Sequence, residues 1–464
     1  MASNRLSALD ASFLDVETAS AHMHVGWAAA FDPPEDRPRP SFEQLRDHIA
    51  RRLQRAPRYR QRLEGVPLGV ARPVWVDDDR FDVTRHVRPA DRPSLDELAG
   101  SVLSTPLSRE RPLWEMWVSE RLDDGRIGLV GKAHHCMVDG LAAVELATVL
   151  LDVEPDCPPD RLDEWEPAAP PGGPRRLADG LLDTSRGYLA LAGSAAGLLA
   201  SPRKLLSGAQ RTAEALAHSL APASELDTLN APISPYRALA TLARPMDELR
   251  SIKRGHGCTV NDVVLAASTG GVRRHLERHG EQPARLKAMV PVNVRDDNAA
   301  EEFGNRISFI FVDLPCAEPD AGKRLRHIRS ATERAKTGGE PAGATTVLDL
   351  AAAAPSILQR AMSRLVASPR TFNVVVSNIP GPQVPMWMLG CRLREAYPVV
   401  PLADRHALSI GFTSVDGGAF FGIYADRDAN ADAELLARDI GDELDELRRR
   451  APAGSRRKAA PVAR

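Results

Sequence analysis

The sequence contains few cysteines and no long apolar run, and each absence excludes a class of protein. Its five cysteines are scattered along 464 residues, and no two of them form a CxxC pair. This pattern argues against a zinc cluster and fits a reducing compartment. No stretch reaches the roughly 20 apolar residues of a membrane-spanning helix, and the N-terminus lacks the apolar run of a secretory signal. We therefore expect a cytoplasmic protein that can still contact a membrane surface.

The chain also has no strong excess of positive or negative charge. The chain has 60 lysines and arginines against 62 aspartates and glutamates, for a formal net charge of -2. No basic stripe is interleaved with aromatic side chains, so we expect no nucleic-acid partner. At roughly 100 to 200 residues per domain, the length allows two or three domains. Such a chain buries a large core without disulfides or metal ions.

Proline, by contrast, is concentrated in one segment. Residues 154–174 read EPDCPPDRLDEWEPAAPPGGP, and we predict a linker there because proline has no amide proton and disfavours helix before it. Residues 175–216 are rich in leucine, alanine and basic residues, and they fit either a surface-packed helix pair or a helix lying on lipid. The predicted division is an N-terminal half, a linker with a helical crossover, a C-terminal half and a disordered tail, at residues 1–153, 154–230, 231–450 and 451–464.

Strand and helix patterns alternate on both sides of this linker. Residues 22–31, HMHVGWAAAF, alternate with a period of two, which predicts a half-buried strand. Ser41 and Gln44 have the spacing of a capping box. A helix is predicted from Thr259, and Asp416 begins the predicted turn of a hairpin. The simplest fold that accounts for these patterns is α/β, with two halves and a cleft between them. Such a cleft is a usual place for a substrate site.

The segment KAHHCMVDG, residues 132–140, lies where a predicted strand gives way to a helix. Because side chains alternate along a strand, His134 and His135 are expected to point to opposite sides. This argues against a metal site built on the pair, and nothing resembles an HExxH motif, so we expect no metal. An imidazole that titrates near neutral pH suits acid–base catalysis instead.

The neighbours of the histidine pair are interpreted as supporting residues. Asp139 either orients a histidine ring or anchors the turn, and the spacing does not decide between them. Gly140 allows tight backbone geometry or the close approach of a ligand. Cys136 follows His135 directly and is expected to point away from it, as a small buried apolar residue.

The motif HHCMVDG resembles the HHxxxDG signature of the CoA-dependent acyltransferase superfamily, which includes chloramphenicol acetyltransferase and peptide-synthetase condensation domains. Further segments are similar to those of the bacterial wax ester synthase/diacylglycerol acyltransferase family, namely LSALDASFLDVET, HMHVGW, RPLWEMWV, NDVVLA, PVNVR, FGNRIS and SNIPGP. These matches run from residue 6 to about residue 382. The DFGWG element of some other superfamily members is absent, as in this family.

The resemblance implies an α/β (α+β) fold of two chloramphenicol-acetyltransferase-like halves. Each half has a mixed sheet with flanking helices, a crossover linker joins them, and a tunnel lies between them. The implied reaction moves an acyl group from a long-chain acyl-CoA, as substrate rather than cofactor, to diacylglycerol or a long-chain alcohol. The implied setting is the surface of a membrane or lipid droplet, bound peripherally, and a homodimer is possible.

The resemblance also suggests roles for single residues. His135 is the implied general base, with His134 beside it, and Asp139 is expected to pair with Arg295. Asn261 and Asp262 either complete a helix cap or help to polarise the thioester carbonyl. The remaining candidates either pack in the core or border the substrate tunnel, and they are Pro112, Leu113, Trp114, Ser377 and Asn378.

Two other functions fit the same sequence. One is an acyltransferase of the condensation-domain type with a carrier-bound donor, although no carrier domain is evident. The other is a lipid-droplet binding protein that retains the fold without catalysis, against which the intact His135, Asp139 and Gly140 argue. The sequence does not distinguish diacylglycerol from a fatty alcohol as acceptor.

Overall fold

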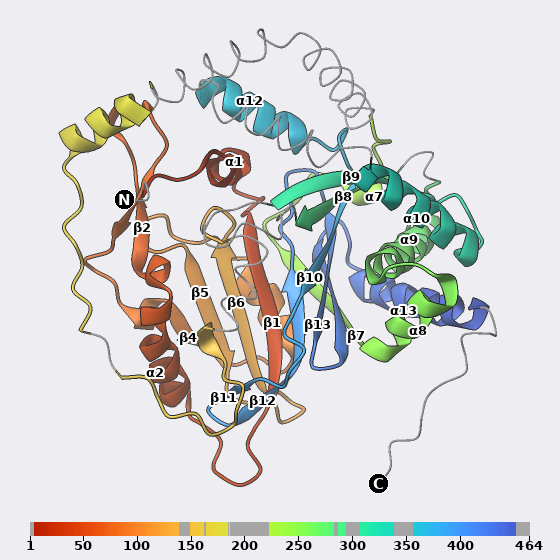
Figure 1. Cartoon of the computed structure of the whole chain (residues 1–464), viewed down its shortest axis with the longest axis horizontal. Helices are drawn as coiled ribbons and strands as arrows, with labels where there is room; N and C mark the ends of the chain where they lie inside the picture. The colour runs from red at the N-terminus through yellow and green to blue at the C-terminus, as the bar shows by residue number, and fades with distance from the viewer. Residues whose placement is uncertain are drawn as a thin grey trace.

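Two six-stranded mixed sheets, each flanked by helices, stand side by side in a computed structural model of the chain (Figure 1). This arrangement confirms the predicted fold class. The structure describes residues 4–138, 149–161, 164–183, 185, 222–282, 286–293, 307–337 and 356–451.

The first sheet has the strand order β11-β12-β1-β6-β5-β4, and a separate two-stranded sheet pairs β2 with β3. Within the first sheet only β4 and β5 run parallel; its other neighbours are antiparallel. The strands are β1 (His24–Asp32), β2 (Gln61–Glu64), β3 (Val74–Asp77), β4 (Val87–Pro89), β5 (Trp114–Ser119), β6 (Ile127–His134), β11 (Trp387–Met388) and β12 (Cys391–Val399).

The second sheet has the order β7-β14-β13-β10-β8-β9. Strand β10 runs parallel to both β13 and β8, and the outer pairs are antiparallel. The strands are β7 (Arg237–Pro245), β8 (Leu286–Asn293), β9 (Ile307–Leu314), β10 (Val374–Pro380), β13 (Leu408–Val415) and β14 (Gly418–Asp426).

Helices α8, α9, α10 and α13 gather beside the second sheet, whereas α2 lies beside the first and α1 and α12 lie together at the top of the view in Figure 1. None of the helices within the described ranges is long and apolar enough to cross a membrane. The α-helices are α1 (Ala8–Val16), α2 (Phe42–Arg52), α3 (Leu95–Leu103), α7 (Asp227–Asn230), α8 (Met246–His256), α9 (Val260–Arg278), α10 (Ala321–Thr337), α12 (Ser356–Val366) and α13 (Ala433–Arg450).

Several local predictions are confirmed. Ser41 caps α2 in a full capping box with Gln44, and Thr259 caps α9. The hairpin of β13 and β14 turns at Asp416 and Gly417, both with positive φ, of 45° and 78°. Such a pair of positive φ values is what a two-residue hairpin turn requires.

The strand predicted at residues 22–31 is present as β1, but the prediction that it is half-buried was wrong. Strand β1 is buried on both faces, and within it only Trp27 and Asp32 are partly exposed. The reason is its central position: β6 pairs with one edge of β1 and β12 with the other. A strand inside a covered sheet has apolar residues on both faces rather than on one.

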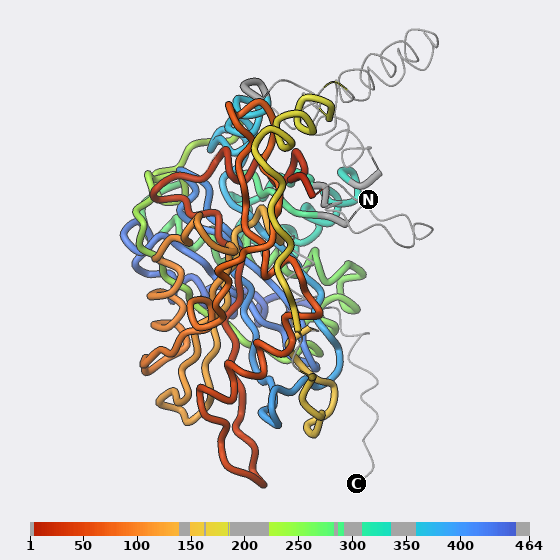
Figure 2. Tube along the Cα trace, turned by 90° about the vertical axis from the view of Figure 1, so that its left-hand side faces the viewer, coloured from red at the N-terminus to blue at the C-terminus, as the bar shows by residue number. Residues whose placement is uncertain are grey.

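The crossover region lies partly outside the described residues. The described parts of the linker run along the outer edge of the first half, as the yellow trace shows in Figures 1 and 2. Trp165 meets Phe81 edge-on, and Arg60 lies 5.1 Å from the centre of its indole. Residues 173–183 then form a helix. The rest of the predicted helical segment 175–216, apart from residue 185, lies outside the described residues.

The sheets do not follow the order of the chain. Strand β12 comes from the last sixth of the sequence, yet it pairs with β1 in the first sheet, where Trp27 lies opposite Pro398. The next strand, β13, returns to the second sheet. Our domain boundaries at residues 153 and 231 stay predictions, but the two halves share this strand.

Strand β12 also packs closely on the second sheet. Gly411 and Gly422 lie opposite each other on β13 and β14. A Cβ atom at Gly422 would be 2.2 Å from the carbonyl oxygen of Pro398, and one at Gly411 would be 2.9 Å from the same oxygen. The absence of side chains at both positions therefore lets the backbone of β12 approach the second sheet.

We predict that Gly422→Ala destabilises the protein by about 1 to 3 kcal/mol, because the added methyl group forces backbone atoms apart. The free energy of unfolding in urea measures this effect. Gly65→Ala is the matched control, since its Cβ meets no atom within 4 Å, and its expected effect is within about 0.5 kcal/mol. Equal stability of both variants would contradict the close approach.

Candidate active site

His135 is the first residue after β6, at the point where the chain turns. Its amide donates a hydrogen bond to the carbonyl of Met23, with N and O 2.9 Å apart. The amide of Met137 donates to the carbonyl of His134 at 2.8 Å and closes the turn. These backbone bonds fix His135 at the end of β6.

A cavity of about 230 Å³ opens beside His135, and its lining is mostly apolar. Both halves contribute to it. Helix α1, strand β1 and His135 come from the first half, whereas β8, β9, β10, α12 and the residues after β12 come from the second. Polar lining side chains are few, and they are Ser12, His135, Ser363 and Ser377.

Strand β10 supplies one wall of this cavity through alternate residues. Val375, Ser377 and Ile379 line the cavity, as the period of two along a strand requires. Asn378 is not among the lining residues. Of the two predicted tunnel residues on this strand, the structure therefore brings Ser377 to the cavity and not Asn378.

Within the described residues, Phe13 and Val138 hold the ring of His135. The ring of Phe13, on α1, stacks on it with the centroids 3.7 Å apart and the planes 6° from parallel. Nδ1 lies 3.2 Å from the carbonyl oxygen of Val138. Because a carbonyl only accepts, Nδ1 carries the proton, and the lone pair of the neutral ring is on Nε2. This tautomer can accept a proton at Nε2.

Met23 holds a strained backbone next to this histidine. Its φ is 50°, in the left-handed region that a residue with a bulky side chain rarely adopts. The same residue lines the cavity and accepts the His135 amide. Strain of this kind persists only where the surroundings impose it, and it is found often at functional sites.

His134 has different surroundings and is fully buried. Its Nδ1 accepts a hydrogen bond from the Cys136 amide at 3.1 Å, so its proton is on Nε2, which lies 3.6 Å from a carboxylate oxygen of Glu17. Glu17 in turn pairs with Arg109. Burial, helped by Arg109 and His135, lowers the pKa of His134 to about 3. A ring that stays neutral and enclosed supports the turn that carries His135.

Cys136 is buried against Leu6, Ala11 and Leu113. Burial raises the pKa of its thiol well above the usual range. A thiolate is therefore strongly disfavoured there, which argues against Cys136 as a nucleophile.

The residues of the PLW motif lie in the core and not at the cavity. Trp114 stacks on His86, meets Tyr59 edge-on, and donates a hydrogen bond from Nε1 to the Tyr59 carbonyl at 2.7 Å. Leu113 is buried, and its carbonyl accepts the amide of His134. Neither these two nor Pro112 is among the lining residues. Their contribution to the site is through the backbone that positions the histidine pair.

Asp262 completes the capping box of α9. One carboxylate oxygen accepts from the amide and hydroxyl of Thr259, at 2.8 and 2.7 Å, and the other accepts from the Thr332 hydroxyl at 2.7 Å. The residue is buried and ties α9 to α10. Asn261 stands in the same first turn but is not among the cavity residues.

Three predicted residues, Asp139, Gly140 and Arg295, lie outside the described residues. The expected pairing of Asp139 with Arg295 therefore stays a prediction.

Sequence reasoning missed most of the cavity wall. Helix α1, which carries Phe13, was not predicted as a helix, although Ser7 and Asp10 have the spacing of a cap and the Ser7 hydroxyl accepts the Asp10 amide. Helix α12, which contributes Met362 and Val366, was also missed. No sequence signal indicates the positive φ of Met23.

Comparison with known families covers nearly the whole chain. Residues 6–264 match the wax ester synthase/diacylglycerol acyltransferase catalytic domain, and residues 303–448 match the corresponding C-terminal domain. The chain is 33% identical over 460 residues to a probable diacylglycerol O-acyltransferase of Mycobacterium tuberculosis strain H37Rv, with 96% of each chain covered.

Solved structures give the same result. A wax ester synthase/diacylglycerol acyltransferase from Marinobacter aquaeolei VT8 superposes with a TM-score of 0.69 at 26% identity, covering 96% of this chain and 99% of the other. A trichothecene 15-O-acetyltransferase from Fusarium sporotrichioides has a TM-score of 0.61 at 13% identity, covering 96% and 95%. At that identity the second likeness concerns the fold alone.

The pKa of His134 predicts how stability depends on pH. An unfolded chain protonates this residue below about pH 6.5, whereas the folded protein does so only near pH 3. The neutral ring therefore stabilises the fold above pH 6.5, and this stabilisation is lost as the pH falls from 6.5 toward 3, by about 1.4 kcal/mol per unit.

We expect His134→Asn to flatten the pH dependence of the unfolding free energy near pH 5, measured in urea. Asparagine keeps an acceptor for the Cys136 amide but does not titrate. The control is His327→Asn, which alters an exposed histidine of α10. If the unfolding free energy of His134→Asn depends on pH as steeply as that of the wild type, this histidine has the same pKa in the folded and unfolded states.

Proposed function

Because the chain belongs to the wax ester synthase/diacylglycerol acyltransferase family and is an acyltransferase, we propose that it transfers a long-chain acyl group from acyl-CoA to a hydroxyl. The acceptor we propose is diacylglycerol or a long-chain alcohol. The observation that carries this proposal is the position of His135, whose Nδ1 lies against the carbonyl of Val138, at the wall of a mostly apolar cavity.

The proposed chemistry needs one base. Nε2 of His135 takes the proton of the acceptor hydroxyl as that oxygen attacks the thioester carbonyl, and a tetrahedral oxyanion forms. When this intermediate collapses, the carbon–sulfur bond breaks and the imidazolium returns the proton to the leaving thiolate. No acyl-enzyme forms, and no cofactor is needed. The Val138 carbonyl stabilises the imidazolium because it accepts the Nδ1 proton throughout.

The cavity supports a lipid substrate. Its walls are hydrocarbon and aromatic side chains from both halves, such as Val16, Phe309 and Val400. An acyl chain placed there is removed from water, at a gain of roughly 0.8 kcal/mol for each buried methylene group. The role of Asn261 in polarising the thioester stays a prediction, and so does that of Ser377.

We expect His135→Ala to lower the turnover of palmitoyl-CoA by about 10² to 10⁴-fold, the usual contribution of a general base. Purified protein is assayed with dioleoylglycerol or hexadecanol, and both ester and free thiol are followed. His327→Ala, at the exposed helix position, serves as the control. Turnover of His135→Ala at the wild-type rate would refute the mechanism. The acceptor that is converted to an ester by the wild type identifies the reaction.

We also propose that the protein collects its substrates by binding peripherally to a membrane or lipid droplet. The helix of residues 173–183 lies against the short 3-10 helix Pro67–Gly69, since a Cβ at Gly173 would be 3.6 Å from the Pro67 ring. Leu68 is 90% exposed, and Leu181 and Leu182 are each more than half exposed. Exposed leucines on two elements in contact are typical of a surface that meets lipid.

Replacing Leu68, Leu181 and Leu182 together by serine is expected to lower binding to phosphatidylcholine vesicles containing phosphatidylserine, measured by co-sedimentation, at least about fivefold. Each Å² of apolar surface that enters the bilayer contributes roughly 25 cal/mol to the binding free energy. The serine variant buries less apolar surface and therefore binds more weakly. Leu365→Ser is the matched control, because that leucine is 58% exposed on α12. Undiminished binding of the triple variant would exclude this surface.

A further inference from the structure

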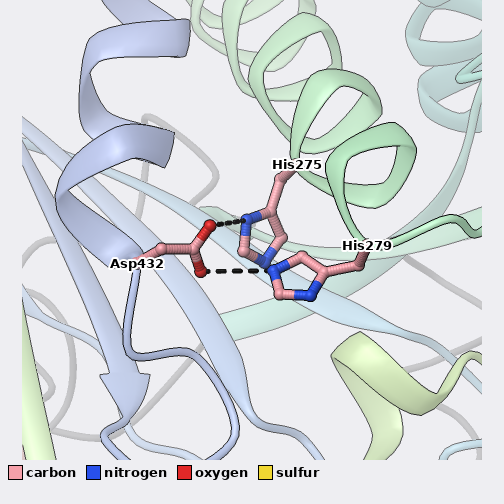
Figure 3. Close-up of side chains that lie close together, drawn as sticks. All are labelled: His275, His279 and Asp432. Atoms are coloured by element: carbon pink, nitrogen blue, oxygen red, sulfur yellow. Dashed lines mark hydrogen bonds and ion pairs between the residues drawn. The ribbon is translucent and has the colours of Figure 1, made fainter.

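A second cluster of reactive side chains lies outside the lining of the cavity beside His135, at the junction of α9 and α13. His275 lies in the last turn of α9, His279 is the C-cap residue of the same helix, and Asp432 is the N-cap residue of α13. Figure 3 shows both imidazole rings directed at the two oxygens of this carboxylate. One ligand atom from each residue lies within 4.8 Å of the others.

The environment of His275 determines its tautomer. The side-chain nitrogen of Asn430 donates hydrogen bonds to the carbonyls of Thr228 and Ala407, each at 3.2 Å. The amide oxygen of Asn430 is therefore the atom that faces Nε2 of His275, at 2.8 Å. Because this oxygen only accepts, Nε2 of His275 carries the proton.

The other ring nitrogen of His275 is consequently a buried acceptor. Its side chain is fully enclosed, and Nδ1 makes no hydrogen bond. The nearest carboxylate oxygen of Asp432 is 3.5 Å away. A lone pair that faces an anion is unfavourable when no proton or cation lies between them. Metal-bound histidines typically donate the other ring proton to an oxygen, as His275 does here.

The spacing between each histidine nitrogen and the carboxylate of Asp432 is close to that of ligands around a small tetrahedral ion. Ligands held about 2.0 to 2.1 Å from zinc are about 3.3 to 3.4 Å from each other. The distances are 3.5 Å from Nδ1 of His275 to Asp432, and 3.3 Å from Nε2 of His279 to the other oxygen of Asp432. These two distances end on different oxygens of Asp432, so the carboxylate has to turn to bring one oxygen to an ion shared by both rings, whose ligand atoms lie within 4.8 Å of one another.

Nearby charges are compatible with a cation. Arg278 donates to Asp432 at 3.1 Å and to Asp439 at 2.7 Å. Two carboxylates therefore face one guanidinium, which leaves a net charge of -1 before an ion binds. His279 is 37% exposed on its side chain, so an ion and a water ligand can reach the site from solvent.

We propose that His275, His279 and Asp432 bind one divalent transition-metal ion of the zinc class, with water as the fourth ligand. Two imidazoles favour zinc, copper or nickel over magnesium or calcium, which prefer oxygen ligands. The ion joins the end of α9 to the start of α13 and takes no part in acyl transfer. Our expectation of no metal rested on the pair at residues 134 and 135, on the lack of an HExxH motif and on the scattered cysteines.

The test uses the full chain without a histidine tag, stripped with a chelator. Zinc is titrated into the protein by calorimetry, and cobalt is followed by the visible absorption bands of tetrahedral Co²⁺. The variants are His279→Ala, which changes a partly exposed ligand and leaves the enclosed His275 in place, and Asp432→Asn. The control is His327→Ala. Circular dichroism confirms that each variant is folded.

We expect one ion per wild-type chain, at least about 100-fold weaker binding in His279→Ala and Asp432→Asn, and unchanged binding in His327→Ala. Zinc is also expected to raise the melting temperature of the wild type and not of the two ligand variants. Absence of stoichiometric binding to the wild type overturns the proposal. So does wild-type affinity in His279→Ala.

Discussion

The placement of β12 is the constraint on which the rest of the structure depends. One strand completes the first sheet through its pairing with β1, and the same strand rests on two glycines of the second sheet. The two halves therefore cannot separate without loss of the backbone hydrogen bonds of β1 or of the contact at Gly411 and Gly422. The relative position of the sheets is determined by main-chain geometry, which is less easily altered than a contact between side chains.

The candidate active site follows from this arrangement. His135 belongs to the first half, and much of the cavity beside it is lined by the second half and by residues that continue directly from β12. Phe13 and Val138 hold the ring, and Met23 accepts its amide in a strained conformation. For the general-base role that we propose, the ring of His135 is thus oriented before substrate arrives, so little reorganisation is needed during the reaction.

The sequence was informative where structure depends on near neighbours. Caps at Ser41 and Thr259 and the turn at Asp416 are encoded within a few residues, and each was predicted correctly. The histidine pair was found because its residue types and position are themselves distinctive. Because side chains alternate along a strand, Ser377 and Asn378 could have been predicted to face opposite sides, so that only one of them lines the cavity. Pairings between distant segments leave no such local pattern, which is why the burial of β1 was missed, whereas helix α1 was overlooked despite the cap spacing of Ser7 and Asp10.

The strand shared between the halves also has a consequence for synthesis of the chain. Strand β1 emerges from the ribosome near the beginning of translation, whereas β12 emerges only after about five-sixths of the sequence. Throughout that interval one edge of β1, within a predominantly apolar sheet, has no native partner. Unpaired apolar edges are sites of misassociation, and contacts between such distant residues form slowly. The nascent chain is therefore expected to depend on chaperones until its last sixth has been made.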